Sequence, residues 1–150
     1  MLTQVAGRAG RGDAPGRVIL QTFSPDHFCI QAAANHDFSA FYAIEIMSRQ
    51  AYGYPPFRRF VKLTYTHKDR HTCQMEAISM GDHLARLIDN LGLAETDIVG
   101  PAPAFIERLR NHYRWQIVLR GPEPHAVIAA LTPQEVGPGW TIDIDPTSLL

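Results

Sequence analysis

The segment from Asp69 to Leu91 constrains the fold of this chain more than any other stretch of its 150 residues. Its apolar side chains recur every three or four positions, the spacing that places them on one face of a helix. Asp69 is a suitable N-cap, and Gly92 is expected to end the last turn. The pattern therefore predicts a long helix with an apolar face made of Met75, Ile78, Leu84, Leu87, Ile88 and Leu91.

Strand patterns lie on both sides of this helix. Before it, apolar residues at 61, 63 and 65 alternate with polar ones, as in a strand with one buried side. After it, Ile98-Val99 and the alternating residues 113–120 indicate two strands joined across 108–112. "PEPHAVIAALTP" suits a short helix, and "WTIDIDP" alternates like a final strand. The order predicts an α+β domain (β-α-β-β-α-β), with two helices on one face of a four-stranded sheet and the other face free to bind.

The sequence before residue 57 contains fewer patterns that predict helices or strands. The apolar run Val18 to Leu20 follows a Pro-Gly turn and predicts a buried strand. A short helix is expected to follow, with Ser24 as N-cap and Pro25 in its first position. A second helix should begin near residue 36 and end at Gly53, because two prolines follow it closely. "AYGYPPF" therefore marks a boundary between an N-terminal part and the sheet domain.

Composition narrows the classes of protein. No apolar run approaches the roughly 18 residues of a membrane span, and the first residues lack the apolar core of a signal peptide, so a cytoplasmic protein is expected. Cys29 and Cys73 have no spacing typical of a metal site, so none is expected. Net charge is only −1, but five Lys/Arg and one acid lie between residues 58 and 70, and residues 121–150 hold four acids and no Lys/Arg.

Arginines near residue 110 are the best candidates for DNA contact. Arg108, Arg110 and Arg114 stand beside Tyr113 and Trp115, and single-strand binding combines cations for phosphates with aromatic rings for bases. The alternation also permits the two aromatic residues to point into the core and leave the arginines on a solvated face. Two further arginines, Arg58 and Arg59, are expected either to contact DNA phosphates or to hold the preceding segment in place.

The chain opens on "QVAGRAGRGD", a stretch whose glycines and arginines suit contact with a nucleotide. Glycines let the backbone come close to a polyphosphate, and guanidinium groups can bind γ-phosphate oxygens as the phosphoryl group leaves. The alternative is a Gly/Arg-rich tail that contacts anions loosely. On the first interpretation Arg8 and Arg11 are catalytic, and the nucleotide-binding set is Gln4, Gly7, Arg8, Gly10 and Arg11.

This stretch resembles helicase motif VI of superfamily 2 as found in the primosomal protein N′ family, and "YPPF", "GPAPA" and "YRWQ" resemble that family's C-terminal region. The resemblance implies an ATP-dependent 3′–5′ DNA helicase that recognises abandoned replication forks and restarts replication. It implies ATP, Mg²⁺ and zinc in the parent protein, and DNA, primosome proteins and single-strand binding protein as partners. On this basis residues 1–35 are the end of a RecA-like motor domain, 36–56 a connecting helix and linker, and 57–150 a DNA-binding domain with a ribosomal-protein-like fold.

No phosphate-binding loop G-x-x-x-x-G-K-[ST] and no acidic metal-binding box occur in the chain. The family's zinc-binding cysteine pairs are also absent. We therefore expect a C-terminal piece of the helicase that cannot hydrolyse ATP alone. The alternatives are a stand-alone, non-enzymatic module that binds single-stranded DNA or replication proteins, and a protein-docking sheet without DNA contact.

Overall fold

The computed structural model describes residues 2–7 and 17–149. The chain divides into two compact units, Met1–Tyr52 and Gly53–Leu150, so the division falls within the expected connecting segment 36–56. Across the described residues, no helix combines the length and apolar character needed to cross a membrane.

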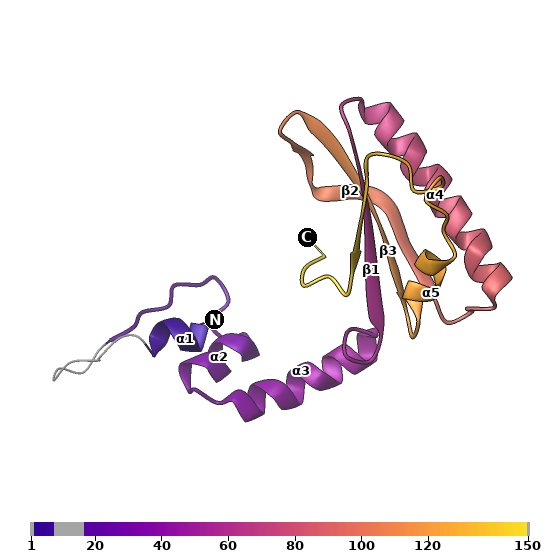
Figure 1. Ribbon diagram of the computed structural model, residues 1–150. Coiled ribbons are helices and arrows are strands. Elements are labelled where there is room, and N and C mark those ends of the chain that lie inside the picture. Colours follow the sequence, from indigo (N-terminus) through magenta and orange to yellow (C-terminus); the bar gives the residue numbers. More distant parts are fainter. Residues whose placement is uncertain (1, 8–16, 150) are drawn as a thin grey trace. The chain divides into compact units, whose positions relative to one another are not determined.

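The first unit contains three helices, α1 (Leu2–Ala6), α2 (Phe28–Ala34) and α3 (Phe38–Tyr52) (Figure 1). α3 confirms the helix expected from residue 36 to Gly53, and the Asp37 carboxylate accepts a hydrogen bond from the Ala40 N–H at 2.8 Å to cap its first turn. The rings of Phe28 and Phe41 stack with their centroids 6.0 Å apart, so aromatic contacts join α2 and α3.

Two expectations for this unit are wrong. Residues 18–20 are not a strand: a strand needs a hydrogen-bonded neighbour, and every strand pairing in the described chain joins residues from 59 onward. Likewise, α2 begins at Phe28 rather than just after Ser24. His27 is its N-cap, because its Nδ1 accepts a hydrogen bond from the Cys29 N–H at 3.3 Å, and Pro25 lies in the turn before it.

The second unit is the predicted α+β domain. Its antiparallel sheet has the strand order β2-β3-β1-β4, with bounds β1 (Arg59–His67), β2 (Asp97–Leu109), β3 (His112–Gly121) and β4 (Trp140–Ile144). Helices α4 (Arg70–Leu91) and α5 (Pro124–Ala129) both pack on one face of this sheet (Figure 1). The order of elements, the hairpin β2-β3 and the placement of both helices on one face are confirmed.

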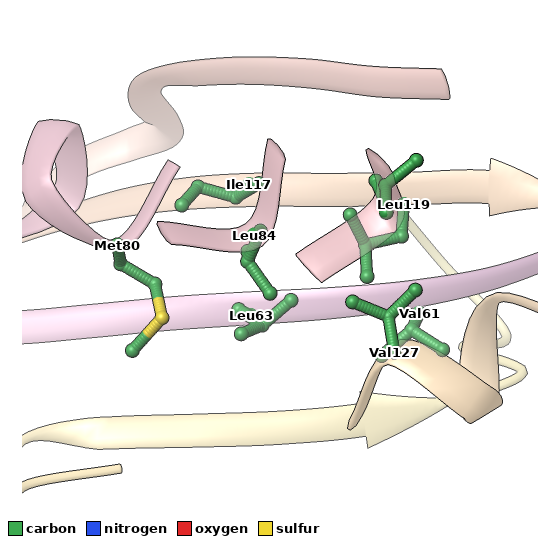
Figure 2. Packing of buried hydrophobic residues seen from close by; sticks show 8 residues of the cluster. Val61, Leu63, Met80, Leu84, Ile117, Leu119 and Val127 are labelled. Carbon is green, nitrogen blue, oxygen red and sulfur yellow. The ribbon is translucent and has the colours of Figure 1, made fainter. Parts of the chain in front are cut away.

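The main core lies between α4, α5 and the sheet. Figure 2 shows Met80 and Leu84 of α4 directed toward the strands, with Leu63 of β1 beneath them and Val127 of α5 beside Val61. Complete burial of such side chains is the main stabilising contribution in a domain of this size. Its buried members are Val61, Leu63, Met80, Leu84, Ile88, Ile117, Leu119 and Val127.

The predicted apolar face of α4 is partly wrong. Met75 and Leu91 are 50% and 46% exposed, although both fit the helical spacing. The buried face instead includes Cys73, Ala77 and Gly81. Small residues are needed there because α4 passes close to β2: a Cβ on Gly81 would lie 3.2 Å from Pro101 Cδ. A pattern built only on large apolar residues therefore gives a face rotated away from the true one.

The sequence predicts that the sheet face opposite the helices is free, but this is only partly correct, because one end of that face is covered. At one end the Tyr54 ring packs edge-on against Phe60, with centroids 5.6 Å apart, and Phe60 is only 4% exposed. The Lys62 ammonium donates a hydrogen bond to the Ser148 carbonyl at 2.7 Å, which brings the C-terminal segment onto the same end. Val118, which pairs with Lys62 on this face, is also buried, although it alternates with the core residues Ile117 and Leu119. Toward the opposite end, near His67, the residues of this face, Thr66, Arg114 and Gln116, are half-buried.

Candidate nucleic-acid interface

Two basic stretches that are distant in the sequence meet at one end of the sheet. β1 ends at His67, which pairs with Tyr113 beside the turn of the β2-β3 hairpin. α4 begins three residues after β1 ends, and the Arg70 Nε donates to the Glu107 carboxylate at 2.7 Å, which joins its first turn to β2. Segments 67–71 and 107–114 together hold five Lys/Arg and two acids, a formal charge of +3. We call this surface the basic end.

The opposite end of the domain has the opposite charge. It contains six carboxylates and four Lys/Arg (Arg58, Arg59, Lys62 and Arg120), and two of these cations are held by acids. Arg120 donates to the Asp97 carboxylate at 3.0 Å, and Arg58 lies 3.9 Å from the carboxylates of both Asp97 and Glu95. Segregation of this kind directs the field of the domain, so that an anion is attracted to the basic end. The carboxylates of the acidic end are Asp89, Glu95, Asp97, Glu123, Asp143 and Asp145.

Three cations of the basic end make no ion pair or hydrogen bond through their side chains within residues 2–7 and 17–149: Lys68, Arg110 and Arg114. The other two are engaged. Hydrogen bonding to the Glu107 carboxylate raises the pKa of Arg70, so this guanidinium stays charged. Arg108 bonds to Asn111 and covers the Tyr113 ring at 5.3 Å. Lys68, Arg110 and Arg114 are therefore the groups available to an incoming anion.

Backbone geometry presents Arg110 at the tip of the hairpin. Arg110 and Asn111 have φ values of 50° and 65°, so both lie in the left-handed region that a two-residue hairpin turn requires. Asparagine tolerates this conformation better than most residues, and its side chain also accepts the bond from Arg108. The turn thus places an arginine where two strands end and solvent begins.

Buried and capping groups hold the basic end together. Burial raises the pKa of Cys73, so its thiol stays protonated and donates to the carbonyls of Tyr65 and Tyr113 at 3.5 and 3.4 Å. These bonds tie the first turn of α4 to β1 and β3. A hydrogen bond from the Thr72 backbone N–H lowers the pKa of Asp69, which stays ionised as the N-cap of α4.

The predicted arginines near residue 110 do not share one face. Arg108 pairs with Tyr113, whose side of the sheet carries the helices, whereas Arg114 pairs with Thr66 on the opposite side. Arg110 lies in the turn between these two sides. The structure therefore places the three arginines around the rim of the basic end. A single nucleic-acid strand could contact all of them only by passing from one side of the sheet to the other.

Arg58 and Arg59 lie far from this rim, at the other end of β1. Eight residue steps separate Arg59 from His67, or about 26 Å at the rise of a strand. The Arg58 Nη1 donates to the Glu95 carbonyl at 2.6 Å, whereas Arg59 is exposed and lines a small cavity with Pro55, Pro56 and Asp145. The five arginines predicted to bind DNA therefore belong to two separate surfaces.

Tyr113 and Trp115 point toward the core, as the second interpretation of the alternation predicted. Trp115 is 7% exposed and belongs to a cluster with Tyr65, Cys73 and Ala77. Tyr113 packs against the same cluster and lies under Arg108. Trp115 is therefore closed to a base, and the half-buried Tyr113 ring has one face covered by Arg108. Sequence reasoning assigned no role to Lys68, although it lies within the basic run 58–70, because only the tertiary structure brings that run against the hairpin.

The predicted nucleotide-binding residues lie mostly outside the described part of the chain. Arg8, Gly10 and Arg11 are not described; Gln4 is an exposed residue of α1, and Gly7 donates its N–H to the Thr3 carbonyl at 2.9 Å just after that helix. Their assignment to a nucleotide site stays a prediction.

The second unit is therefore a small α+β domain with a cationic rim at one end, a surface whose charge attracts anionic groups such as phosphates. Residues 50–147 match the family model of the primosomal protein N C-terminal domain, and the chain belongs to this family. The predicted resemblance to the family's C-terminal region is thus confirmed.

Similar proteins extend the match beyond this domain. The chain is 38% identical to the replication restart protein PriA of Synechocystis sp. over 99% of its own length and 18% of that protein. It is 38% identical to the replication restart protein PriA of Bacillus subtilis over 80% of this chain and 14% of the relative. For that of Thermotoga maritima the values are 27% identity, 99% and 19%. The chain therefore spans less than a fifth of the length of these relatives.

Proposed function

We propose that residues 53–149 form the single-stranded-DNA-binding module of a protein that restarts replication, with the basic end as its phosphate-binding surface. The convergence of two basic stretches, with Lys68, Arg110 and Arg114 left without acidic partners among the described residues, carries this proposal. Relatives bearing the name replication restart protein support the biological role.

The wider proposal concerns a longer protein, of the length of these relatives. This longer protein is an ATP-dependent 3′–5′ DNA helicase that recognises abandoned forks. Its Arg8 and Arg11 contact the γ-phosphate of an ATP-Mg²⁺ complex held by motor domains. Primosome proteins and single-strand binding protein are its expected partners, and zinc would be bound outside this chain. The motif "QVAGRAGR" and its distance from "YPPF" support this assignment.

Fluorescence anisotropy of a labelled single-stranded oligonucleotide, titrated at several salt concentrations, tests the module. Each neutralised phosphate contributes about 0.7 to the slope of log K against log salt, so three contacts predict a slope of about −2. Arg110→Ala/Arg114→Ala should reduce the slope to about −0.7 and weaken binding at low salt.

The matched control removes the same charge elsewhere. Arg17→Ala/Arg86→Ala changes two exposed arginines outside the basic end and should leave the slope unchanged. If the control loses as much affinity as Arg110→Ala/Arg114→Ala, general charge rather than the basic end binds DNA. If wild type does not bind at low salt, the module has no DNA contact of its own and is better described as a docking domain.

A further inference from the structure

β2 contains a bulge next to the basic end. Pro103 pairs with Trp115 and Arg108 with Tyr113, so the four residues 104–107 of β2 face one residue, Arg114, of β3. Extra residues in one strand cannot stay in the ladder, and they bend the strand and redirect its side chains.

Both sides of this bulge are anchored. Ala104 is 6% exposed, and Glu107 accepts the hydrogen bond from Arg70 on α4. Between these anchors, Phe105 is 76% exposed and Ile106 is 53% exposed. The two side chains thus lie exposed in a segment that is fixed at one end by the burial of Ala104 and at the other by the hydrogen bond of Glu107.

Phe105 is the aromatic residue of the hairpin that is open to solvent. The other two, Tyr113 and Trp115, are covered by Arg108 and by the core. Phe105 stands three residues from Arg108 and five from Arg110 along the same hairpin. Exposed aromatic faces next to cations that hold a phosphate backbone are what sequence-independent single-strand binding uses.

We propose that Phe105 is a base-stacking residue of the basic end, which takes an unpaired nucleobase of a strand whose phosphates lie on Lys68, Arg110 and Arg114. This inference rests on the proposed DNA-binding function and deepens it. Bases of a duplex are stacked on one another and offer no face to Phe105, so the residue selects single-stranded over double-stranded DNA. Ile106 extends the apolar surface beside the ring.

Pairing of β2 with a strand of another protein is the competing explanation for an exposed aromatic residue on an edge strand. Two features of β2 oppose it. Pro101 and Pro103 lack the N–H groups that a strand ladder needs, and the bulge interrupts the register. A stacked base needs only the exposed face of the ring.

The test uses the whole chain and an oligonucleotide containing 2-aminopurine, whose fluorescence reports stacking, together with the anisotropy titration. Phe105→Ala should weaken single-strand binding about 5- to 150-fold, the range for loss of one stacked base. The salt slope should not change, because no phosphate contact is lost, and duplex affinity should not change either. Phe105→Tyr should bind like wild type.

Two controls locate the effect. Phe57→Ala removes an exposed phenyl ring near the other end of β1 and should leave affinity unchanged. An oligonucleotide with abasic sites should bind wild type and Phe105→Ala equally. Equal single-strand affinity for wild type and Phe105→Ala, an equal loss on duplex DNA, or a wild-type dimer that Phe105→Ala dissociates would each overturn the inference.

Failure of the inference can be told apart from failure of the proposed function. If Arg110→Ala/Arg114→Ala loses the salt-dependent binding and Phe105→Ala binds like wild type, the basic end binds phosphates and only the stacking role is wrong. If wild type binds neither single-stranded nor duplex DNA at low salt, both are wrong.

Discussion

Leu84 and Met75 are side chains of one helix in very different surroundings. Leu84 is fully buried between α4 and the sheet, whereas Met75 is half exposed. Removing buried methyl groups loses their transfer free energy and leaves a cavity, but an exposed side chain can be shortened without either effect. The position of a residue on the helix, more than its type, therefore sets its contribution to stability.

Leu84→Ala should lower the free energy of unfolding by about 2–5 kcal/mol, as is usual for a fully buried leucine. Met75→Ala should change it by less than about 0.5 kcal/mol, as is usual for surface substitutions. Urea unfolding followed by circular dichroism measures both. A similar loss in the two variants would show that the helix face predicted from large apolar residues was correct after all.

The two ends of helix α4 are set by capping residues, Asp69 and Gly92, that do not belong to its apolar face. Asp69 accepts the Thr72 N–H at 2.7 Å, and Gly92 ends the helix with a φ of 67°, in the left-handed region where glycine is favoured. Both ends confirm the sequence prediction, because capping depends on local chemistry. β2 behaves differently, since its bulge depends on how Pro103 and Arg108 pair with another strand.

Capping by Asp69 should make the stability of this helix depend on pH. The Thr72 hydrogen bonds, and to a lesser extent His67 and His71, lower its folded-state pKa from the ordinary value of 3.8. The stabilisation is therefore present above about pH 4 and is lost as pH falls through the lowered folded-state pKa. Asp69→Asn keeps the cap but cannot ionise.

Melting temperatures of wild type and Asp69→Asn at several pH values measure this effect. Wild type should be the more stable at pH 7, and the difference should shrink toward pH 2. Subtracting the two curves removes the titration of all other carboxylates. A difference that does not vary with pH would mean that the ionised carboxylate of Asp69 adds nothing to the cap.

Charge is distributed over the whole sheet domain in a way that no single element shows. The basic end and the acidic end lie at opposite ends of the same strands. The domain therefore has an electric dipole along its strands, although the net charge of the chain is only −1. The N-terminal arginines are different again, because their proposed partner, a nucleotide held by motor domains, lies outside this chain.

Arg8→Ala, made in a protein of the relatives' length, should lower DNA-stimulated ATP hydrolysis by roughly 1,000-fold or more, the usual loss for an arginine that contacts the transferred phosphoryl group. Binding of a fluorescent ATP analogue should be largely retained. Arg17→Ala, an exposed arginine nearby, is the control and should hydrolyse ATP like wild type. Unchanged hydrolysis by Arg8→Ala would remove the arginine from the proposed catalytic group.

Local patterns in the sequence were enough to predict the order of the elements in the sheet domain, the ends of α4 and the inward orientation of Trp115. Periodicity and capping involve residues a few positions apart, so the sequence alone contains that information. The same reasoning failed for residues 18–20, because a strand exists only with a neighbour to accept its hydrogen bonds.

Only the tertiary structure decided which cations stand together. Arg58 and Lys68 belong to one basic run in the sequence, yet β1 carries them to opposite ends of the sheet, and the hairpin brings Arg110 to the end where Lys68 lies. The exposure of Phe105 likewise depends on strand pairing and on the contact of Glu107 with α4. Binding surfaces are made by residues distant in sequence, and their assembly follows from packing of the core, which no local pattern contains.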